Sequence, residues 1–310
     1  MYRYIIVIIT FCFFSCNNKN QSLPESTGAE NEILIVIEDF IWEGEKGDFI
    51  KSILRKEIYG LNQPEPFFNT PQVNRKEFNN ILQRHKNIIL FQEKKGDLKF
   101  QKNKWAKNQL IFQIDISQAE EKTKEELKKI IEFFTIKELK YINSQISRSQ
   151  LQGAQEKIKN KFQINAKIPS EYTIIKDTTN LFWVGFKNNG KNEDEIHQII
   201  IYSFYPKTKN IINEVISNTD IVFSKNLYFY SEGIKQHDHV EIYKEQEPIF
   251  ENNIYRGFWR TTGKSFMGGP FFAKQYIKED NKVVVVAAII YAPNKSKRKY
   301  IKRIEAMFLD

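Results

Sequence analysis

The sequence predicts an α+β protein in which antiparallel sheets carry helices packed on one face. Apolar runs of strand length occur beside amphipathic runs of helix length, and they do not follow the regular strand–helix order of a parallel sheet. The elements fall into two α+β halves, 32–165 and 166–310, after an N-terminal signal at 1–15 and a tether at 16–31. A chain of 310 residues, 41% of them hydrophobic, suits one large or two ordinary domains.

The first half is predicted to begin with a buried strand at 32–38, because five apolar residues stand between Glu32 and Glu38. The stretch 60–71 contains three prolines and must be an extended loop. From Ser117 onward, a capping box and a helical apolar period predict the longest helix of the chain. The other predicted elements are helices at 48–58, 74–85 and 154–162 and strands at 87–92 and 110–116.

The second half opens at Pro169, which favours an extended conformation. Residues 283–291 are so uniformly apolar that they predict a central strand, which Pro293 ends. Ser296 is placed to cap a final amphipathic helix. The other predictions are a helix that begins near 211 and antiparallel strands at 173–175, 181–186, 196–204, 249–261 and 271–277.

The two cysteines of the chain, Cys12 and Cys16, both lie in the first sixteen residues. The rest of the chain therefore lacks the ligands and nucleophiles of a disulfide scaffold, a zinc finger, an iron–sulfur protein or a thiol-based enzyme. The cysteine count excludes these four classes.

The N-terminus has the pattern of a secretory signal peptide, in which Arg3, an apolar run at 4–14 and the small residue Ser15 precede Cys16. The run is shorter than the roughly 20 residues that a membrane span needs. The segment 13–16 (FFSC) resembles the bacterial lipobox, in which cleavage before the cysteine accompanies attachment of a diacylglycerol to its sulfur. It departs from the commonest lipoboxes in carrying Phe where they carry Leu. The alternative is an uncleaved signal anchor with Cys16 at the interface.

Lipidation of Cys16 would make the membrane a partner through an N-terminal lipid anchor. The polar residues 17–31 have the composition of a flexible tether, which would span about 20 Å. No acidic cluster follows the cysteine, so the expected location is the cell envelope, on the periplasmic side of the outer membrane. Nucleic acid is not an expected partner of an exported protein, despite a formal net charge of +9.

The segment 255–272 is the main candidate for ligand binding. If its first part is a strand, Arg256 and Arg260 share one face and Trp259 lies on the other. Two arginines beside aromatic rings suit an anionic or sugar ligand, and a glycine turn after them would let backbone amides approach it. In the alternative interpretation the tryptophan is core and the glycines form a bulge. The candidate ligand-binding residues are Arg256, Trp259, Arg260, Lys264, Gly268 and Gly269.

His237 and His239 are the candidate metal ligands, because in a strand they would share one face. A metal site needs a third or fourth ligand, and the sequence offers none at a defined spacing. The prediction is therefore that the protein holds no metal, and no cofactor motif occurs either.

An acidic cluster, Glu38, Asp39, Glu43 and Glu45, offers carboxylates for acid–base chemistry. It also fits the solvated end of a strand, since nothing in the spacing fixes a carboxylate separation. No nucleophile elbow, phosphate loop or His-Glu-x-x-His motif occurs, and no catalytic residue is assigned.

Several stretches together resemble domain-of-unknown-function family 4837, a family of uncharacterised Bacteroidota envelope lipoproteins. The resemblance implies an exported, lipid-anchored envelope protein and transfers no catalytic residue. The stretches that carry it are 39–48 (DFIWEGEKGD), 62–69 (NQPEPFFN), 78–90, 105–109 (WAKNQ), 256–272 and 283–293.

The leading hypothesis from the sequence is a membrane-tethered envelope protein that catalyses no reaction and binds an envelope protein or polymer through its second half. The alternative is an envelope hydrolase that uses the acidic residues. The two hypotheses differ in whether those carboxylates converge in a pocket.

Overall fold

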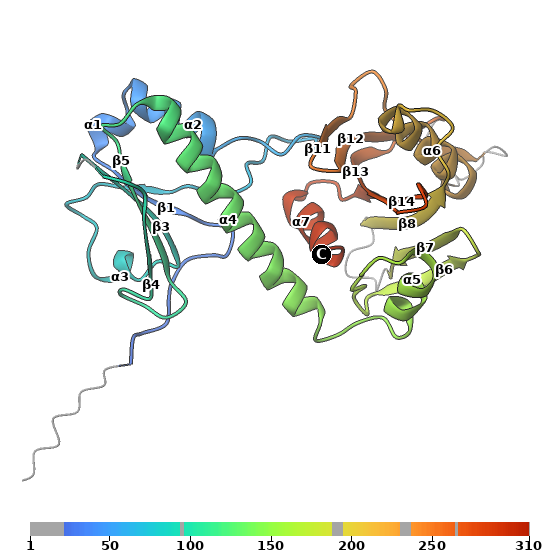
Figure 1. The fold of residues 1–310 in the computed structure, drawn as a ribbon, viewed down its shortest axis with the longest axis horizontal. Helices are drawn as coiled ribbons and strands as arrows, with labels where there is room; N and C mark the ends of the chain where they lie inside the picture. The colour runs from blue at the N-terminus through green and yellow to red at the C-terminus, as the bar shows by residue number, and fades with distance from the viewer. Residues whose placement is uncertain (1–21, 94–95, 188–194, 230–236, 264–265, 310) are drawn as a thin grey trace, which may run out of the picture.

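The computed structural model describes residues 22–93, 96–187, 195–229, 237–263 and 266–309, which form two lobes joined by a long helix (Figure 1). The predicted signal peptide and Cys16 lie outside the described residues. Within the described ranges, no helix has the length and apolar character that crossing a bilayer requires. The α+β class is confirmed.

The first lobe contains a mixed sheet with the strand order β2-β1-β3-β5-β4. Strands β2, β1, β3 and β5 run parallel, and β4 pairs antiparallel with β5 at the edge. The elements of this lobe are β1 (Leu34–Val36), α1 (Asp39–Trp42), α2 (Glu45–Leu54), β2 (Gln72–Val73), α3 (Asn80–Gln83), β3 (Asn87–Gln92), β4 (Lys99–Lys102), β5 (Leu110–Asp115) and α4 (Glu120–Ile146).

The antiparallel pairing that the sequence pattern favoured does not hold in this first sheet. Helices α1 and α2 carry the chain from β1 to β2, and such a crossover is what parallel neighbours require. The pattern misses it because β1 and β2 are only three and two residues long, too short to show the order of a parallel unit.

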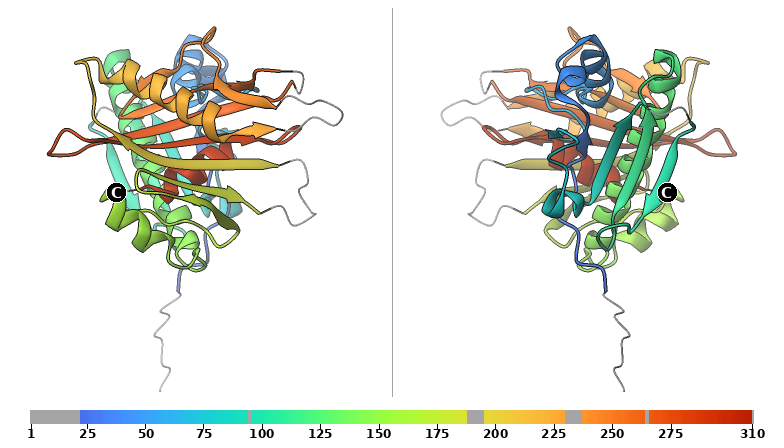
Figure 2. Two further views of the ribbon diagram at one scale, coloured as in Figure 1. Left: turned by 90° about the vertical axis from the view of Figure 1, so that its right-hand side faces the viewer. Right: turned by 90° about the vertical axis from the view of Figure 1, so that its left-hand side faces the viewer.

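The second lobe contains an antiparallel sheet with the order β6-β7-β8-β14-β13-β12-β10-β9, in which β11 also pairs with β12 (Figure 2). The apolar run is the strand β14 and lies between β8 and β13, as predicted. The elements of this lobe are α5 (Ala154–Phe162), β6 (Tyr172–Asp177), β7 (Leu181–Phe186), β8 (Ile196–Phe204), α6 (Ile211–Asn226), β9 (Tyr228–Phe229), β10 (Asp238–Ile242), β11 (Ile249–Glu251), β12 (Ile254–Thr261), β13 (Gly268–Ile277), β14 (Val283–Tyr291) and α7 (Arg298–Met307).

Helices cover both faces of the second sheet rather than one. Val284 and Val286 face the core that contains α5 and α7, whereas Val283 and Val285 face the core that contains α6. Two covered faces explain why the whole of β14 is apolar, since neither side of a strand buried on both faces meets water. Helix α5 packs in the same core as α7, in the second lobe, although the sequence division at residue 165 assigns it to the first half.

Residues 22–31 are not a free tether. The Lys107 amide donates to the Pro24 carbonyl at 2.8 Å, the Thr27 amide donates to the Arg84 carbonyl at 2.9 Å, and the Lys86 amide donates back to the Thr27 carbonyl at 2.8 Å. These bonds hold the segment against the first lobe. The contact of this segment with the first lobe could not be predicted from its composition, because backbone groups make these bonds and no apolar period in the sequence marks them.

Helix α4 belongs to both lobes. Its N-terminal part packs in the core of the first sheet through Leu127, Ile130 and Phe134, and its C-terminal part packs against the second sheet through Leu139 and Ile146. The helix is 27 residues long, so its two ends lie about 40 Å apart. One rigid element therefore contributes to two separate cores.

Helix α7 is the second connection between the lobes. Lys302 on this helix pairs with Glu138 of α4 at 2.5 Å and donates to the carbonyl of Phe67 at 2.6 Å. The two charged side chains are 3% and 7% exposed. Burial lowers the pKa of Lys302 and raises that of Glu138, so each charge depends on the other to remain in the interior.

The N-terminus of α7 is capped from the first lobe. Glu65, in the proline-rich loop, accepts the amide of Lys297 at 2.7 Å and that of Arg298 at 3.3 Å, and also the hydroxyl of Ser296. The predicted Ser296 cap is therefore replaced by a carboxylate that is 231 residues earlier in the chain. A negative charge is favourable here because the first amides of a helix lack intrahelical partners.

We expect Lys302→Met to lower the free energy of unfolding by about 3–5 kcal/mol, because it leaves the Glu138 carboxylate buried without its partner. Urea unfolding measures this loss. The double variant Glu138→Leu/Lys302→Met should recover part of it. Lys124→Met, which breaks the exposed pair with Glu121, is the control and should cost less than about 1 kcal/mol. A Lys302→Met protein as stable as the wild type would contradict the prediction.

Candidate functional site

Strand β12 has the predicted alternation of faces. Tyr255 and Trp259 are buried in the core beneath α6, whereas Arg256 and Arg260 point to the opposite side of the sheet. The two arginines nevertheless have different partners. Arg256 forms an ion pair with Glu305 of α7, and Arg260 pairs with Glu241 of β10 at 2.7 Å. The predicted arginine clamp is therefore not formed.

Arg256 packs between the two lobes. Its side chain is 15% exposed, and its guanidinium lies over the ring of Phe67 at 5.9 Å. Phe67 also lies 5.7 Å from the ammonium of Lys302. Arg256 thus belongs to the contact that holds α7, and a ligand-binding role for it is not supported.

Trp259 closes the core rather than lining a pocket. It is 1% exposed, and its indole nitrogen donates to the carbonyl of Ile290 at 3.1 Å. Gly269 allows this approach, because a Cβ there would stand 2.1 Å from the same carbonyl oxygen. Gly268 and Gly269 are the first residues of β13, opposite Arg260 and Trp259, and not a turn. The interpretation of Trp259 as a core residue is therefore correct, but the two glycines pair with β12 in regular register and do not form the bulge that this interpretation expected.

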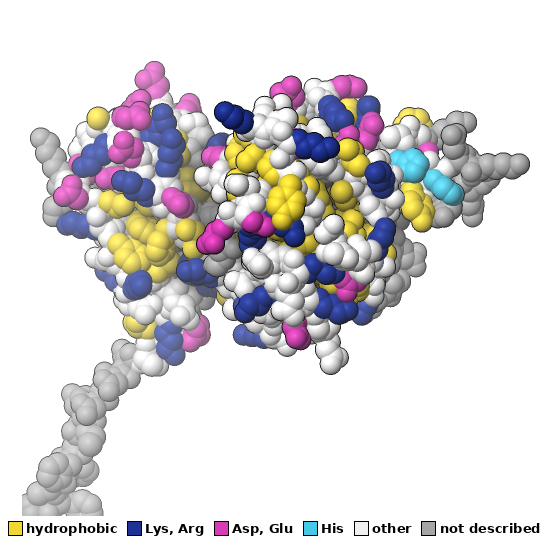
Figure 3. Space-filling model, turned by 45° about the vertical axis from the view of Figure 1, so that its right-hand side comes forward, with side chains coloured by type: hydrophobic (Ala, Val, Ile, Leu, Met, Phe, Trp, Pro, Cys, Tyr) yellow, Lys and Arg dark blue, Asp and Glu magenta, His cyan; other side chains and the backbone are white. Residues whose placement is uncertain are grey.

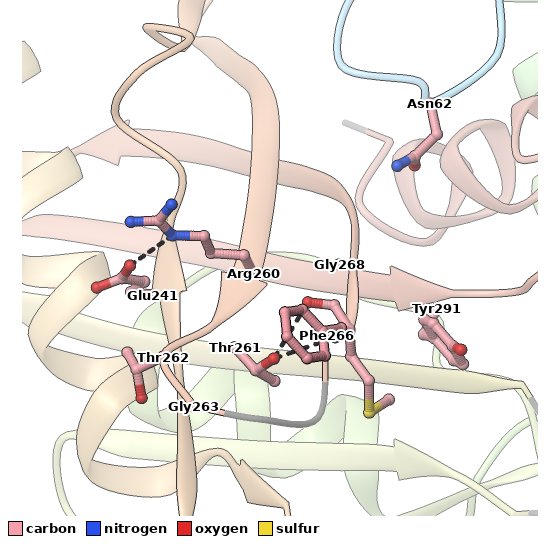
Figure 4. Close-up of a pocket in the computed structure, with 10 residues that line it drawn as sticks. Asn62, Glu241, Arg260, Thr261, Thr262, Gly263, Phe266, Gly268 and Tyr291 are labelled. Carbon is pink, nitrogen blue, oxygen red and sulfur yellow. Dashed lines mark hydrogen bonds and ion pairs between the residues drawn. The ribbon is translucent and has the colours of Figure 1, made fainter.

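Arg260 and Gly268 line an open cleft of about 780 Å³ at one end of the second sheet (Figure 4). Figure 4 shows Arg260 turned toward Glu241, with Phe266 beyond it and Asn62 and Tyr291 across the opening. Lys264 lies outside the described residues. The described residues that line the cleft are Asn62, Glu241, Arg260, Thr261, Thr262, Gly263, Phe266, Met267, Gly268 and Tyr291.

The cleft offers a cation, hydroxyl-bearing side chains and aromatic rings. Arg260 pairs with Glu241 at 2.7 Å and with Glu245 at 3.4 Å and lies over the ring of Tyr243 at 4.9 Å, yet its side chain remains 47% exposed. Phe266 is 92% exposed at the rim. A guanidinium has five N–H donors, so one that pairs with two carboxylates and is still half-exposed can donate to a ligand carboxylate or sugar hydroxyl, and an exposed ring can stack on a flat ligand face.

Of the ten described lining residues, the candidates from the sequence include only Arg260 and Gly268. Asn62, Phe266 and Tyr291 are among those that sequence reasoning missed. Asn62 comes from the proline-rich loop of the first lobe, far away in the sequence. Phe266 belongs to the segment that the sequence singled out, but a phenylalanine among apolar neighbours looks like core. Phe266 has a left-handed backbone conformation, with φ 45°, which is uncommon for phenylalanine and could not be predicted from the residue type.

The two candidate metal ligands do not form a metal site. His239 is exposed in β10 and its Nδ1 donates to the carbonyl of Ser224 at 2.8 Å, while the ring of His237 lies 5.5 Å from that of Tyr228. His237 precedes the strand, so the shared strand face is not formed. In the part of the chain that the structure describes, no three His, Cys, Asp or Glu side chains gather as a metal site would need.

The acidic cluster is divided by α1. Asp39 is exposed and accepts a hydrogen bond from Gln72 at 2.8 Å, which lowers the pKa of its carboxyl. Glu43 and Glu45 are also exposed. Glu38 lies 3.7 Å from Arg75 and lines a cleft of about 570 Å³ in the first lobe, at the carboxyl ends of the parallel strands. The cleft is lined by Glu38, Phe40, Ile41, Arg75, Lys76, Phe91, Gln92, Glu93 and Ile116.

The basic C-terminal segment is used in packing. Lys295, Lys302 and Arg303 pair with Glu195, Glu138 and Glu171, respectively. Figure 3 shows basic and acidic side chains intermixed over the visible face of the molecule. The six positive charges at 295–303 therefore do not form the continuous surface that a polyanion would need.

A buried histidine lies apart from both clefts. His197 of β8 is 5% exposed between the rings of Phe186 and Tyr300, at 4.9 and 4.6 Å, and its Nε2 is 3.6 Å from the carboxylate of Glu195. Burial lowers the pKa of His197 to about 4, although the carboxylate opposes this shift. His197 is therefore neutral at pH 7 and has a structural role.

Two family models match the chain. The first, described as a domain of unknown function (DUF4837), matches residues 151–309, just over half of the chain. The chain belongs to the DUF4837 family. The DUF4837 match contains α5, the whole second sheet and α7, so it covers the second core. A model described as a domain of unknown function (DUF8532) matches residues 26–147, the first sheet with α4.

Other comparisons add little to the DUF4837 assignment. No curated protein matches the chain. A crystal structure from Bacteroides thetaiotaomicron VPI-5482 is 11% identical to it, with 46% of this chain and 42% of that chain covered, and the TM-score is 0.20. At that level of similarity, neither fold nor function follows from the comparison.

The stability of the protein should fall as the pH drops from about 6.5 toward 4, because the pKa of His197 is about 4 in the folded chain and about 6.5 in the unfolded chain. In this range the unfolded chain binds a proton at His197 and the folded chain does not. The loss should be about 2 kcal/mol at pH 5 relative to pH 7. Urea unfolding of wild type and His197→Phe at both pH values measures it, with exposed His239→Gln as the control. If the His197→Phe protein kept the wild-type pH dependence, another group would be responsible.

Proposed function

We propose that the protein is an exported, lipid-anchored protein of the cell envelope that binds a partner or ligand rather than catalysing a reaction. Its membrane contact is a lipid on Cys16, its location is the periplasmic side of the outer membrane, and its partner is an envelope protein or polymer. The proposal rests on the N-terminal pattern of Arg3, the apolar run and Ser15-Cys16. It also rests on the cleft at the end of β12 and β13.

The cleft carries the binding part of the proposal. It combines the half-exposed guanidinium of Arg260, which pairs with Glu241 and Glu245, with a strongly exposed aromatic ring. Such an opening is large enough for a small ligand or a segment of a polymer. Phe266 is 92% exposed, so it contributes little to the core. Covering its ring with an apolar partner would stabilise the complex, because apolar surface would be removed from water. Arg260, Phe266 and Tyr291 are therefore the residues to which we assign binding.

The alternative function, an envelope hydrolase that uses acidic residues, has one observation in its favour. Glu38 and Glu93 line the same cleft of the first lobe, at the carboxyl edge of a parallel sheet where ligands of such sheets bind. Arg75 and Lys76 line that cleft too, and Arg75 engages Glu38 and the carbonyl of Phe91. Turnover of an envelope polymer that is lost in Glu38→Gln would favour this alternative.

Metabolic labelling with a fatty acid analogue tests the anchor. The wild type should be labelled, and Cys16→Ala should lose the label because its only acceptor sulfur is gone. Cys12→Ala is the matched control and should be labelled as the wild type is, since cleavage before residue 16 removes position 12. Label that persists in Cys16→Ala would refute the anchor.

Crosslinking in intact cells, followed by purification of the protein with its adducts, tests the cleft. Arg260→Ala and Phe266→Ala should each reduce the captured partner at least about tenfold, because exposed arginine and aromatic residues dominate binding energies. Phe40→Ala removes a comparably exposed ring from the first lobe and should leave capture unchanged. Equal capture by all variants, at equal protein levels, would exclude the cleft as the binding site.

A further inference from the structure

The described chain begins attached to one edge of the first lobe. Besides the backbone bonds of Pro24 and Thr27, the guanidinium of Arg84 donates to the carbonyl of Glu25 at 2.9 Å. The Glu25 carboxylate in turn lies 3.3 Å from the ammonium of Lys107. These contacts fall on Arg84 and Lys86, just after α3, and on Lys107 in the loop between β4 and β5. The exit of the chain is therefore fixed at this edge.

The distance from this edge to a lipid on Cys16 is short. Seven residues lie between Cys16 and Pro24, and the eight Cα–Cα steps from one to the other span at most about 29 Å when fully extended. As a flexible coil it would span about 16 Å on average. A lipid anchor at Cys16 would therefore hold this edge close to the bilayer surface, nearer than the 15-residue tether that the sequence predicts.

The surface at this edge is basic and carries apolar side chains. Lys102 at the end of β4 and Lys104 and Lys107 in the loop that follows are all exposed. Trp105 is half-buried among them, with the Lys104 ammonium 4.3 Å from its ring. Nearby on α3, Ile81 is 69% exposed. Figure 1 shows α3 and β4 at the end of the lobe from which the chain leaves.

This combination suits a membrane surface. Lysines near a bilayer are attracted by anionic headgroups, and tryptophan is enriched at the boundary between headgroups and hydrocarbon. The acidic side chains beside the loop are Glu25, which is paired with Lys107, and Glu77, which is exposed in the turn before α3. The face formed by Ile81 and residues 102–107 is hereafter called the anchor-side face.

We propose that the anchor-side face rests on the anionic lipid surface of the membrane to which Cys16 is attached. The inference depends on the proposed lipid anchor for its orientation, because only the anchor brings this face to the bilayer. It adds a second contact, so that the first lobe sits on the membrane with one defined face. The cleft at the end of β12 and β13, most of whose lining belongs to the other lobe, then takes a fixed position relative to this contact.

Vesicle binding by the unlipidated protein tests the face separately from the anchor. The mature chain from residue 16, with Cys16→Ser, is mixed with vesicles of phosphatidylcholine alone or with phosphatidylglycerol added, and the bound fraction is measured by cosedimentation. The wild-type face should bind the anionic vesicles better and release them as salt is raised. Lys102→Glu/Lys104→Glu should weaken this binding by at least about 25-fold.

The matched control is Lys209→Glu/Lys225→Glu, which makes the same change in net charge at exposed positions of the second lobe. It should bind the anionic vesicles within about threefold of the protein with the unaltered face. Absence of a preference for anionic vesicles, or an equal loss in both double variants, would overturn the proposal. Because no lipid is attached in this experiment, its failure leaves the Cys16 labelling result unaffected, and a failure of labelling leaves this result unaffected.

Discussion

The buried ion pair between Lys302 and Glu138 is the contact on which the arrangement of the two lobes depends. A charge that is almost fully removed from water is tolerated only with its partner in place, so α7 and the middle of α4 must meet whenever the protein is folded. Glu65 adds a second requirement, because the first turn of α7 obtains its acceptor from the other lobe. We therefore expect the two lobes to unfold together, although each has its own core.

This constraint connects the two surfaces to which we assign roles. The chain leaves for its anchor from the first lobe, whereas Arg260 and Phe266 lie in the second. The same proline-rich loop supplies Glu65 to the helix cap and Asn62 to the cleft. A change in how the lobes meet would therefore alter the cleft, and a membrane contact on one lobe would fix the direction in which the other presents it.

The sequence was most informative where a pattern extends over many residues. The uniform apolar run at 283–291 and the helical period after Ser117 correctly predicted the central strand and the long helix. Short elements carry too little pattern, and for this reason the parallel direction of β1 and β2 was missed.

The candidate site shows a second limit. Alternation along β12 correctly separated Arg260 from Trp259, but periodicity says nothing about partners. The role of each arginine depends on a carboxylate that is distant in the sequence. Arg256 pairs with Glu305 and is used in packing, whereas Arg260 pairs with Glu241 and stays half-exposed. Gly269 is explained only once the carbonyl of Ile290, from a neighbouring strand, is seen to occupy the space of a side chain.

Native-state hydrogen exchange, followed residue by residue as denaturant is raised, measures most directly whether the lobes form one unit. The slowest amides of β3 and β5 in the first lobe and of β8 and β14 in the second should merge into one opening with a single free energy. In Lys302→Met the two sets should separate. If the first-lobe amides of the wild-type protein exchanged through an opening of their own, clearly lower in free energy than that of the second lobe, the account would be contradicted.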